Sequence, residues 1–95
     1  MSGNVTQAKI SAAATATGAA FNWNGGIASW AYAATSWSGT ASVQQLGPDG
    51  TTWLNVATAA TANGITAPIY TPPGQYRFSQ SATGPINQSL VIVPT

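Results

Sequence analysis

Turn signals recur along this chain about every ten residues and leave only short segments between them. The clearest are Asn24-Gly25-Gly26, Gly47-Pro48-Asp49-Gly50, Asn63-Gly64 and Pro72-Pro73-Gly74. No segment between them sustains the helical periodicity of about 3.6 residues. The pattern therefore predicts an all-β protein, a small antiparallel β-sandwich that is either immunoglobulin-like or jelly-roll-like.

The sharpest signal is Gly47-Pro48-Asp49-Gly50, which separates two strand-like runs. Pro48 presets φ at the first corner of a turn, Asp49 can accept hydrogen bonds from the backbone beyond it, and Gly50 tolerates a positive φ. We therefore expect a hairpin. Both faces of its return strand carry a large apolar residue, so Trp53 either covers an edge of the core, fills a subunit interface or binds a ligand.

Alternation with a period of two residues predicts which side chains share one face of a strand. The residues expected to share a face are Trp30 with Tyr32, Tyr76 with Phe78, and Ile86 and Gln88 with Leu90 and Ile92. The last strand, Ile86–Val93, ends in an apolar run, so we expect it to be nearly fully buried. A further strand is expected at Ile65–Tyr70, where the prolines that follow end it.

The run Pro73-Gly74-Gln75-Tyr76 lies where an immunoglobulin-like sandwich turns into a late strand. In a tyrosine corner the hydroxyl of such a tyrosine bonds back to the upstream backbone. Pro-Gly turns before aromatic residues are also common in other β proteins, so an ordinary turn is the alternative. Gly74 and Tyr76 are structural residues in both interpretations.

The first twenty residues differ in composition from the rest. Val5–Ile10 alternates weakly and is expected to form an edge strand, on which Lys9 is an edge-protecting charge. Ser11–Ala20 is rich in alanine and threonine and is expected to be an extended arm or a weak strand. We therefore divide the chain into an extended N-terminal arm or weak edge strand at 1–20 and a β-sandwich domain at 21–95.

Charged side chains make up 3% of the chain, whereas soluble domains usually carry about 25%. They are Lys9, Asp49 and Arg77, and the net charge of +1 offers no field that would steer nucleic acid. No apolar run approaches the roughly 18 residues of a membrane-spanning helix. A nearly uncharged surface has little electrostatic protection against self-association, so we expect a surface held in a defined assembly. A monomer solvated by its hydroxyls and amides is the alternative.

The inventory of reactive side chains argues against an enzyme. The chain has no histidine, no cysteine and one carboxylate side chain, so paired-carboxylate catalysis and metal binding lack their groups. A serine nucleophile would have only Lys9 as its base. We expect no catalytic residue, metal ligand or cofactor, and Asp49 is interpreted as a turn residue. Arg77, expected on an outer face, either pairs with Asp49 or another subunit or is simply solvated.

Tryptophan is abundant and suggests a second class of function. Exposed aromatic rings stack on sugars, with asparagine and glutamine as hydrogen-bond partners. The candidates for such a platform are Trp23, Trp30, Trp37 and Trp53. Packing in the core or in an interface is the favoured interpretation, because large aromatic side chains are usually buried.

Several of these runs together resemble a group of small structural proteins of tailed bacteriophages. The residues that carry the resemblance are a Trp-containing strand, Gly39-Thr40-Ala41-Ser42-Val43-Gln44-Gln45-Leu46, Pro48-Asp49-Gly50-Thr51-Thr52-Trp53, Val56, Pro73-Gly74-Gln75-Tyr76-Arg77 and the strand Ser89–Val93. The resemblance covers the chain from about Gly26 onward and leaves Met1 to Asn24 outside it.

The resemblance implies a virion protein with a β-sandwich fold. Among such proteins the resemblance favours a capsid decoration or cement protein. Such a protein is made in the host cytoplasm, sits on the outer capsid surface, binds the major capsid protein and is commonly a trimer. The scarcity of charge and the N-terminal segment depart from the pattern and leave a head or a tail location open. The alternatives are a carbohydrate-binding module and a tail or fibre adaptor. Our candidates for contacts with the capsid or with other copies are Val5, Gln7, Lys9, Ile10, Trp23, Trp53 and Arg77.

Overall fold

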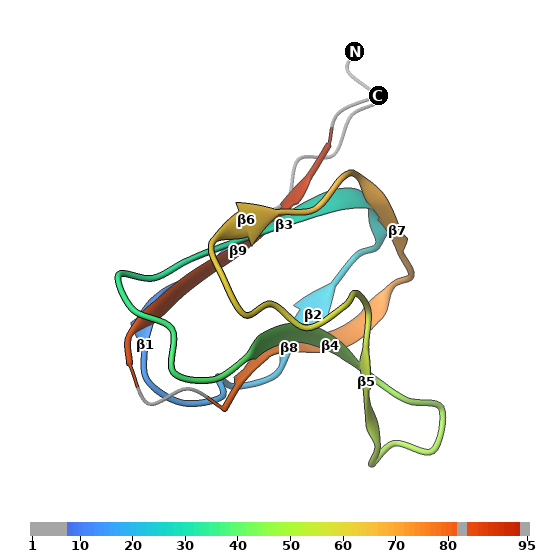
Figure 1. Cartoon of the computed structure of the whole chain (residues 1–95). Coiled ribbons are helices and arrows are strands. Elements are labelled where there is room, and N and C mark those ends of the chain that lie inside the picture. The colour runs from blue at the N-terminus through green and yellow to red at the C-terminus, as the bar shows by residue number, and fades with distance from the viewer. Residues whose placement is uncertain (1–7, 82–83, 94–95) are drawn as a thin grey trace.

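The structure, a computed structural model, describes residues 8–81 and 84–93. Within these residues the chain forms nine strands and no helix, and the strands lie in two antiparallel sheets (Figure 1). The first sheet has the order β1-β9-β3-β6, with β7 also pairing with β3, and the second has the order β2-β8-β4-β5. The strands are β1 (Ala8–Ala14), β2 (Phe21–Trp23), β3 (Gly26–Ala33), β4 (Ala41–Leu46), β5 (Trp53–Asn55), β6 (Gly64–Ile65), β7 (Ile69–Thr71), β8 (Gly74–Gln80) and β9 (Ile86–Ile92).

The strand order shows which kind of sandwich this is. Strands that follow one another in the chain mostly lie in different sheets, and β4–β5 is the one consecutive pair joined in a ladder within the described residues. An immunoglobulin sandwich instead keeps several consecutive strands as neighbours within a sheet. With β6 and β7 taken as one interrupted strand, two four-stranded sheets of this order form a jelly roll. Of the two arrangements that the sequence left open, the fold is therefore the jelly roll.

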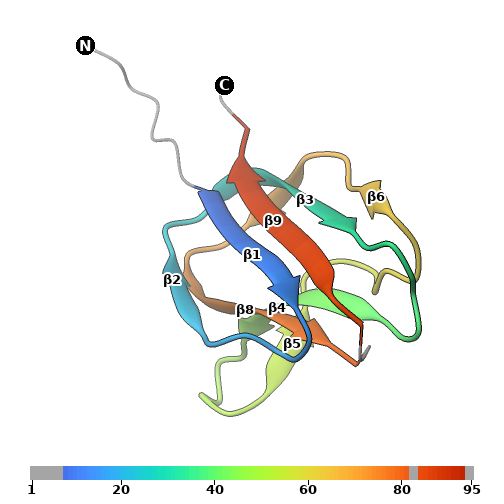
Figure 2. The ribbon, with the colours of Figure 1, turned by 90° about the vertical axis from the view of Figure 1, so that its left-hand side faces the viewer.

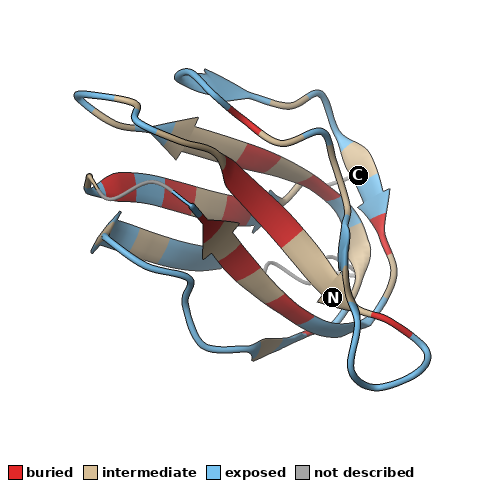
Figure 3. Cartoon of the chain, turned by 60° about the horizontal axis from the view of Figure 1, so that its bottom comes forward, coloured by how far each residue is buried: buried red, intermediate tan, exposed pale blue. Residues whose placement is uncertain are grey.

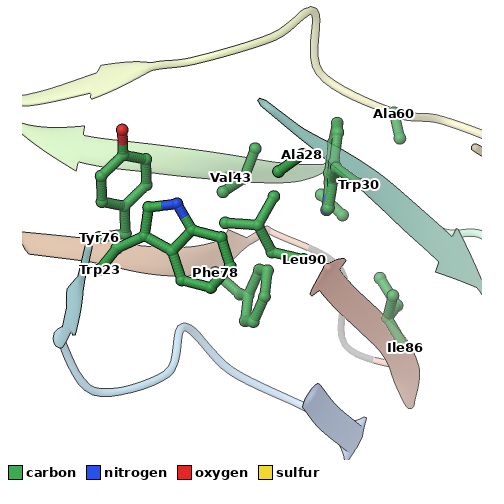
Figure 4. Packing of buried hydrophobic residues seen from close by; sticks show 10 residues of the cluster. Trp23, Ala28, Trp30, Val43, Ala60, Tyr76, Phe78, Ile86 and Leu90 are labelled. Carbon is green, nitrogen blue, oxygen red and sulfur yellow. The ribbon is translucent and has the colours of Figure 1, made fainter. Parts of the chain in front are cut away.

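The core lies between the inner faces of the two sheets. Trp30 and Leu90 from the first sheet meet Val43 and Tyr76 from the second, and all four side chains are fully buried (Figure 4). Each such side chain contributes roughly 1.5–3 kcal/mol when it leaves water. Buried residues are concentrated along the central strands, whereas the connecting loops are mostly exposed (Figure 3). The side chains that alternation predicted to share a face thus lie together on the inner faces, where Tyr32 and Ile92 are partly buried.

Polar atoms inside the core are largely paired, which is required because an unpaired buried polar group is costly. Trp23 Nε1 donates to Thr71 Oγ1 at 2.8 Å, and Trp30 Nε1 donates to Gln88 Oε1 at 3.1 Å. Gln88 therefore belongs to the buried face of β9, as its period predicts. The hydrogen bond to Trp30 explains why glutamine, and not an aliphatic residue, occupies this inward-facing position of β9.

The final strand differs from its prediction. The inner face of β9 is buried, but its outer face is open, and Val91 is 38% exposed. The expectation of a nearly fully buried strand is wrong because β9 lies between β1 and β3 in a fold of two sheets. In the part of the chain that the structure describes, no further strand or helix covers its outer face. Ile65–Tyr70 also differs, since it divides into β6 and β7.

The division of that segment has a local cause. Thr66 N donates to Trp30 O at 2.9 Å, and Trp30 N donates to Thr66 Oγ1 at 3.0 Å. Between β6 and β7, the hydroxyl of Thr66 thus takes the place of a backbone carbonyl in the ladder with β3.

The N-terminal segment is part of the first sheet where the structure describes it. Strand β1 lies at the edge and pairs with β9 from Ala8 opposite Val91 to Ala14 opposite Ile86 (Figure 2). The register is irregular before Ala14, where Ala13 has a φ of 50° and its N–H donates to Asn87 Oδ1 at 2.7 Å. Of the two expectations for this segment, residues 8–14 form the edge strand, and the predicted start at Val5 lies outside the described residues.

After β1 the chain runs beside β8 of the second sheet before it enters β2. Gly18 N donates to Phe78 O at 2.9 Å, and Gln80 Nε2 donates to Ala14 O at 2.7 Å. The alanine- and threonine-rich segment therefore connects the two sheets at one side of the sandwich rather than extending away from it.

The predicted hairpin is confirmed at β4 and β5. Gly50 N donates to Gly47 O at 3.0 Å, and Gly50 has a φ of 75° with open space around it. Asp49 Oδ1 accepts hydrogen bonds from Thr51 N and Thr52 N, and Asp49 Oδ2 accepts one from the Thr52 hydroxyl at 2.6 Å. These donors stabilise the carboxylate and hold the pKa of Asp49 well below its usual value.

The tyrosine-corner contact is also present. Tyr76 Oη donates to Pro72 O at 2.5 Å, and burial, followed by the charge on Tyr70, raises the pKa of Tyr76 to about 12. Gly74 lies at the start of β8, where an added Cβ would come within 2.9 Å of Gln45 Nε2. The contact that the sequence suggested through an immunoglobulin-like corner thus occurs here in a jelly roll.

Candidate interaction surfaces

The outer face of the first sheet is rich in apolar side chains. Register and alternation place the same side of five strands outward, and we call this surface the apolar face. Five of the six large hydrophobic residues that are exposed in the described part of the chain lie on it: Ile10, Ile27, Ile65, Tyr70 and Val91. Small or polar uncharged residues fill the spaces between them, namely Ala8, Ser29, Ala31, Ala33, Asn87 and Ser89.

No charged side chain stands on the apolar face. Lys9 lies on β1, but it is opposite the inward-facing Leu90, and its Nζ lies 5.3 Å from the centre of the Phe21 ring in the second sheet. Asp49 is in the β4–β5 turn and Arg77 is on β8. The three charges of this chain therefore leave one complete sheet face uncharged, although the face is exposed to water.

A shallow hollow of about 180 Å³ lies on the apolar face. Ile10 stands on one side of it and Ala31 and Ala33 on the other, with Asn87 and Ser89 of β9 between them. The small side chains of β3 and β9 create the depression because they leave the larger Ile10 standing above its neighbours. Its chemistry suits an apolar side chain from a partner.

The outer face of the second sheet has a different character. We call it the amide face, and by register it comprises Asn22, Ser42, Gln44, Leu46, Trp53, Asn55, Gln75, Arg77 and Ser79. A polar row crosses three strands, because Arg77, Gln44 and Asn55 lie directly opposite one another. Arg77 Nε donates to Gln44 Oε1 at 2.8 Å, and Gln44 Nε2 donates to Asn55 Oδ1 at 3.0 Å.

Trp53 lies beside this row, and its contacts show what part of its own domain covers the ring. The guanidinium carbon of Arg77 lies over its ring, 4.5 Å from the ring centre. This is a cation–π contact, which is worth about 0.5–1 kcal/mol at exposed sites. A residue of its own domain thus covers one face of Trp53, and Arg77 contacts Trp53 and Gln44 rather than Asp49. The expectation that Arg77 is a plainly solvated side chain is wrong.

The remaining tryptophans do not form an exposed platform. Trp23 and Trp30 are buried in the core. Trp37 is half-buried and packs edge-on against Tyr32 at 6.4 Å, while its Nε1 donates to Asn63 Oδ1 at 2.8 Å. Stacking of a sugar on several open tryptophan rings therefore finds no support in the geometry.

The residues selected from the sequence lie in different places. Ile10 is on the apolar face, Trp53 and Arg77 are together on the amide face, and Lys9 bridges the two sheets at their edge. Trp23 is 2% exposed, so it is part of the core and not of a surface. Val5 and Gln7 lie outside the described residues.

Sequence reasoning missed most of the apolar face. Ile27, Ile65, Tyr70 and Val91 come from four strands, and the pairing partners, which the sequence did not reveal, bring them to one side. Alternation could have placed Ile27 and Val91 on faces opposite the core. It could not have brought Ile65 and Tyr70 to one face, because a single strand from Ile65 to Tyr70 would point them to opposite sides.

Comparison with known proteins adds no relative: no family model, curated protein or solved structure matches this chain. Within residues 8–81 and 84–93 there is also no helix long and apolar enough to cross a membrane.

Proposed function

We propose that this chain is a non-catalytic structural protein of a tailed-phage particle, a capsid decoration or cement protein that binds the major capsid protein. In this proposal it is located on the outer capsid surface, assembles with other copies of itself, with a trimer favoured, and stabilises the shell. The observation that carries the proposal is the apolar face, an exposed sheet surface with five large hydrophobic residues and no charge.

An apolar face of this kind favours a partner over permanent exposure. Contiguous exposed apolar surface marks interaction sites, and covering it contributes about 25 cal/mol for each Å² removed from water. The occupant that we favour is the major capsid protein, which the resemblance to phage structural proteins implies. The hollow beside Ile10 would receive one of its apolar side chains.

The fold agrees with this proposal by analogy. Jelly rolls are common in viral capsid proteins, although they also occur in lectins and cupins. A fold by itself does not establish a function, so the analogy has less weight than the surface.

Lysine substitutions on the apolar face test the proposal. Ile10 and Ile65 are each 68% exposed, so Ile10→Lys and Ile65→Lys should fold normally. Burying the new charge against the shell is costly, and we expect the fraction bound to purified virions in a density gradient to fall at least about tenfold.

Leu54→Lys is the matched control, because Leu54 is a large hydrophobic residue, 50% exposed, that lies on β5 away from the apolar face. It should bind virions as the natural chain does. Undiminished binding of both isoleucine variants, or equal loss with the Leu54 variant, would contradict docking through the apolar face. Absence of the natural chain from purified virions would contradict the whole proposal.

A further inference from the structure

The row on the amide face holds an arginine in a fixed position. Trp53 lies under the guanidinium plane, and Gln44 accepts the hydrogen bond from Arg77 Nε. Asn55 in turn fixes Gln44 by accepting a hydrogen bond from its Nε2. Two contacts in different directions therefore set both the plane and the rotation of the guanidinium before any ligand arrives.

The contacts within the protein leave the outer end of the guanidinium available. Arginine has five N–H donors, and the Nε–H is used by Gln44. Within residues 8–81 and 84–93 neither Nη of Arg77 has a hydrogen-bond partner. The two Nη atoms form a planar fork that matches the two oxygens of a carboxylate, and such paired bonds are among the stronger ones in proteins.

The charge of Arg77 is not neutralised within the described residues. The chain has a single acidic side chain, Asp49, and its oxygens accept hydrogen bonds from Thr51 and Thr52 in the hairpin turn. Arg77 is also the one charged residue of the amide face. An anionic ligand from outside the domain would therefore be complementary to this surface.

The surroundings of Arg77 indicate which kind of carboxylate fits. Protein interfaces usually have an apolar centre, but on the amide face most side chains carry an amide or a hydroxyl and Leu46 is the one aliphatic residue. Arg77 already covers one face of Trp53. Asn55, at the far end of the row, and Gln75, on the same strand as Arg77, are both exposed. A ligand with many hydroxyl groups can pair with such side chains, whereas an apolar protein surface cannot.

We propose that Arg77, held by Trp53 and Gln44, binds the carboxylate of an acidic saccharide on the amide face. The sugar hydroxyls would pair with the neighbouring amides. This site is independent of the proposed docking surface, because the apolar face belongs to the other sheet. It differs from a tryptophan stacking platform, since a charge-assisted hydrogen bond and not an open ring provides the recognition.

Titration of the ¹⁵N-labelled full chain, followed by NMR, tests this site. The ligands are trigalacturonic acid and 3′-sialyllactose, each beside its methyl ester, which keeps the sugar and removes the charge. We expect at least one of the two acids to shift the Arg77 Nε–H and Trp53 Nε1–H resonances, and its ester to bind at least about tenfold more weakly. Failure of both acids to shift these resonances, or equal affinity for acid and ester, would overturn the proposal.

Three variants assign the effect to Arg77. Arg77→Gln should lose at least about tenfold in affinity for the acid, and Lys9→Gln, which removes a charge on β1 of the other sheet, should lose none. Asn55→Asp retains the acceptor for Gln44, adds a negative charge at an exposed position and should also weaken binding at least about tenfold. It keeps the test valid if Arg77→Gln does not fold.

A peptide separates the saccharide from other carboxylates. Acetyl-Glu-Gly-Glu-amide carries the same group without the sugar hydroxyls, and we expect it to bind more weakly than the saccharide acids. Equal or tighter binding of the peptide would overturn the saccharide assignment in favour of a protein carboxylate. Unchanged saccharide affinity in both Arg77→Gln and Asn55→Asp would place the site elsewhere.

Discussion

The two outer faces of this sandwich share a core but not a chemistry. The apolar face on the first sheet carries exposed isoleucine, valine and tyrosine side chains without a charge, and the amide face on the second sheet carries a hydrogen-bonded row ending in Arg77. Both sheets use period-two alternation, so their inward residues are constrained alike. The core does not constrain the outward residues in this way. The difference in chemistry between the two outer faces therefore reflects what each face contacts outside the domain.

Because of this difference, we infer that the two faces make different kinds of contact. Water solvates amides and hydroxyls well, so the amide face is stable when exposed and can exchange water for a polar ligand. Water solvates the apolar face poorly, so a macromolecular partner that covers it gains free energy. In our proposals the same small fold therefore offers one surface for assembly and another for a hydrophilic ligand.

The largest expected effect comes from truncating residues on opposite sides of one strand. Leu90→Ala removes a fully buried side chain of β9 and should lower the free energy of unfolding by about 2–5 kcal/mol. Val91→Ala removes an adjacent side chain of the apolar face and should lower it by less than about 1 kcal/mol. Urea denaturation measures both. Similar losses would show that the apolar face is part of the monomer's own stabilising core.

A smaller effect is expected in the second sheet, where Tyr76 should make the free energy of unfolding depend on alkaline pH. The folded pKa of Tyr76 is raised to about 12 from an ordinary value of 10, so folding favours the protonated hydroxyl. This contribution is complete below pH 10 and is lost as pH rises toward 12. Tyr76→Phe should cost about 0.5–1.5 kcal/mol at neutral pH through the lost bond to Pro72.

The comparison of Tyr76→Phe with the natural chain checks that assignment. Thermal unfolding at a series of alkaline pH values should show a steeper decline for the natural chain than for the variant. Parallel declines would mean that another group, and not the tyrosine corner, controls alkaline stability.

The smallest expected effect is the dependence of binding on salt. Raising sodium chloride from about 50 to about 500 mM should weaken saccharide binding at Arg77 severalfold, because salt screens exposed charges. Virion binding through the uncharged apolar face should not weaken. The NMR titration measures saccharide affinity and the density gradient measures virion binding. An equal decline of both with salt would contradict the proposed difference between the two faces.

Local sequence patterns predicted much of the fold. The Gly47–Gly50 turn was predicted from a proline, an aspartate and a glycine, and in the structure Asp49 accepts the backbone hydrogen bonds and Gly50 has the positive φ that were expected. Trp30 and Tyr76 were placed on inner faces by alternation alone. These features are set within a few residues of chain, which is why the sequence reveals them.

Features that depend on pairing between distant segments were not predictable. The order of β1, β9, β3 and β6 decides between a jelly roll and an immunoglobulin-like sandwich, and no local pattern specifies it. The apolar face follows from that order. Arg77 meets Trp53 because β8 and β5 both lie beside β4, so a contact between residues of separate strands replaced the solvated arginine that composition favoured.

The central claim, that the apolar face docks this protein on a capsid shell, is tested most directly by cryo-electron microscopy of the virion at a resolution that separates strands. The account predicts the β1-β9-β3 sheet against the major capsid protein, with Ile10 and Ile65 covered and the amide face toward solvent. A bound orientation with the apolar face toward solvent would contradict it.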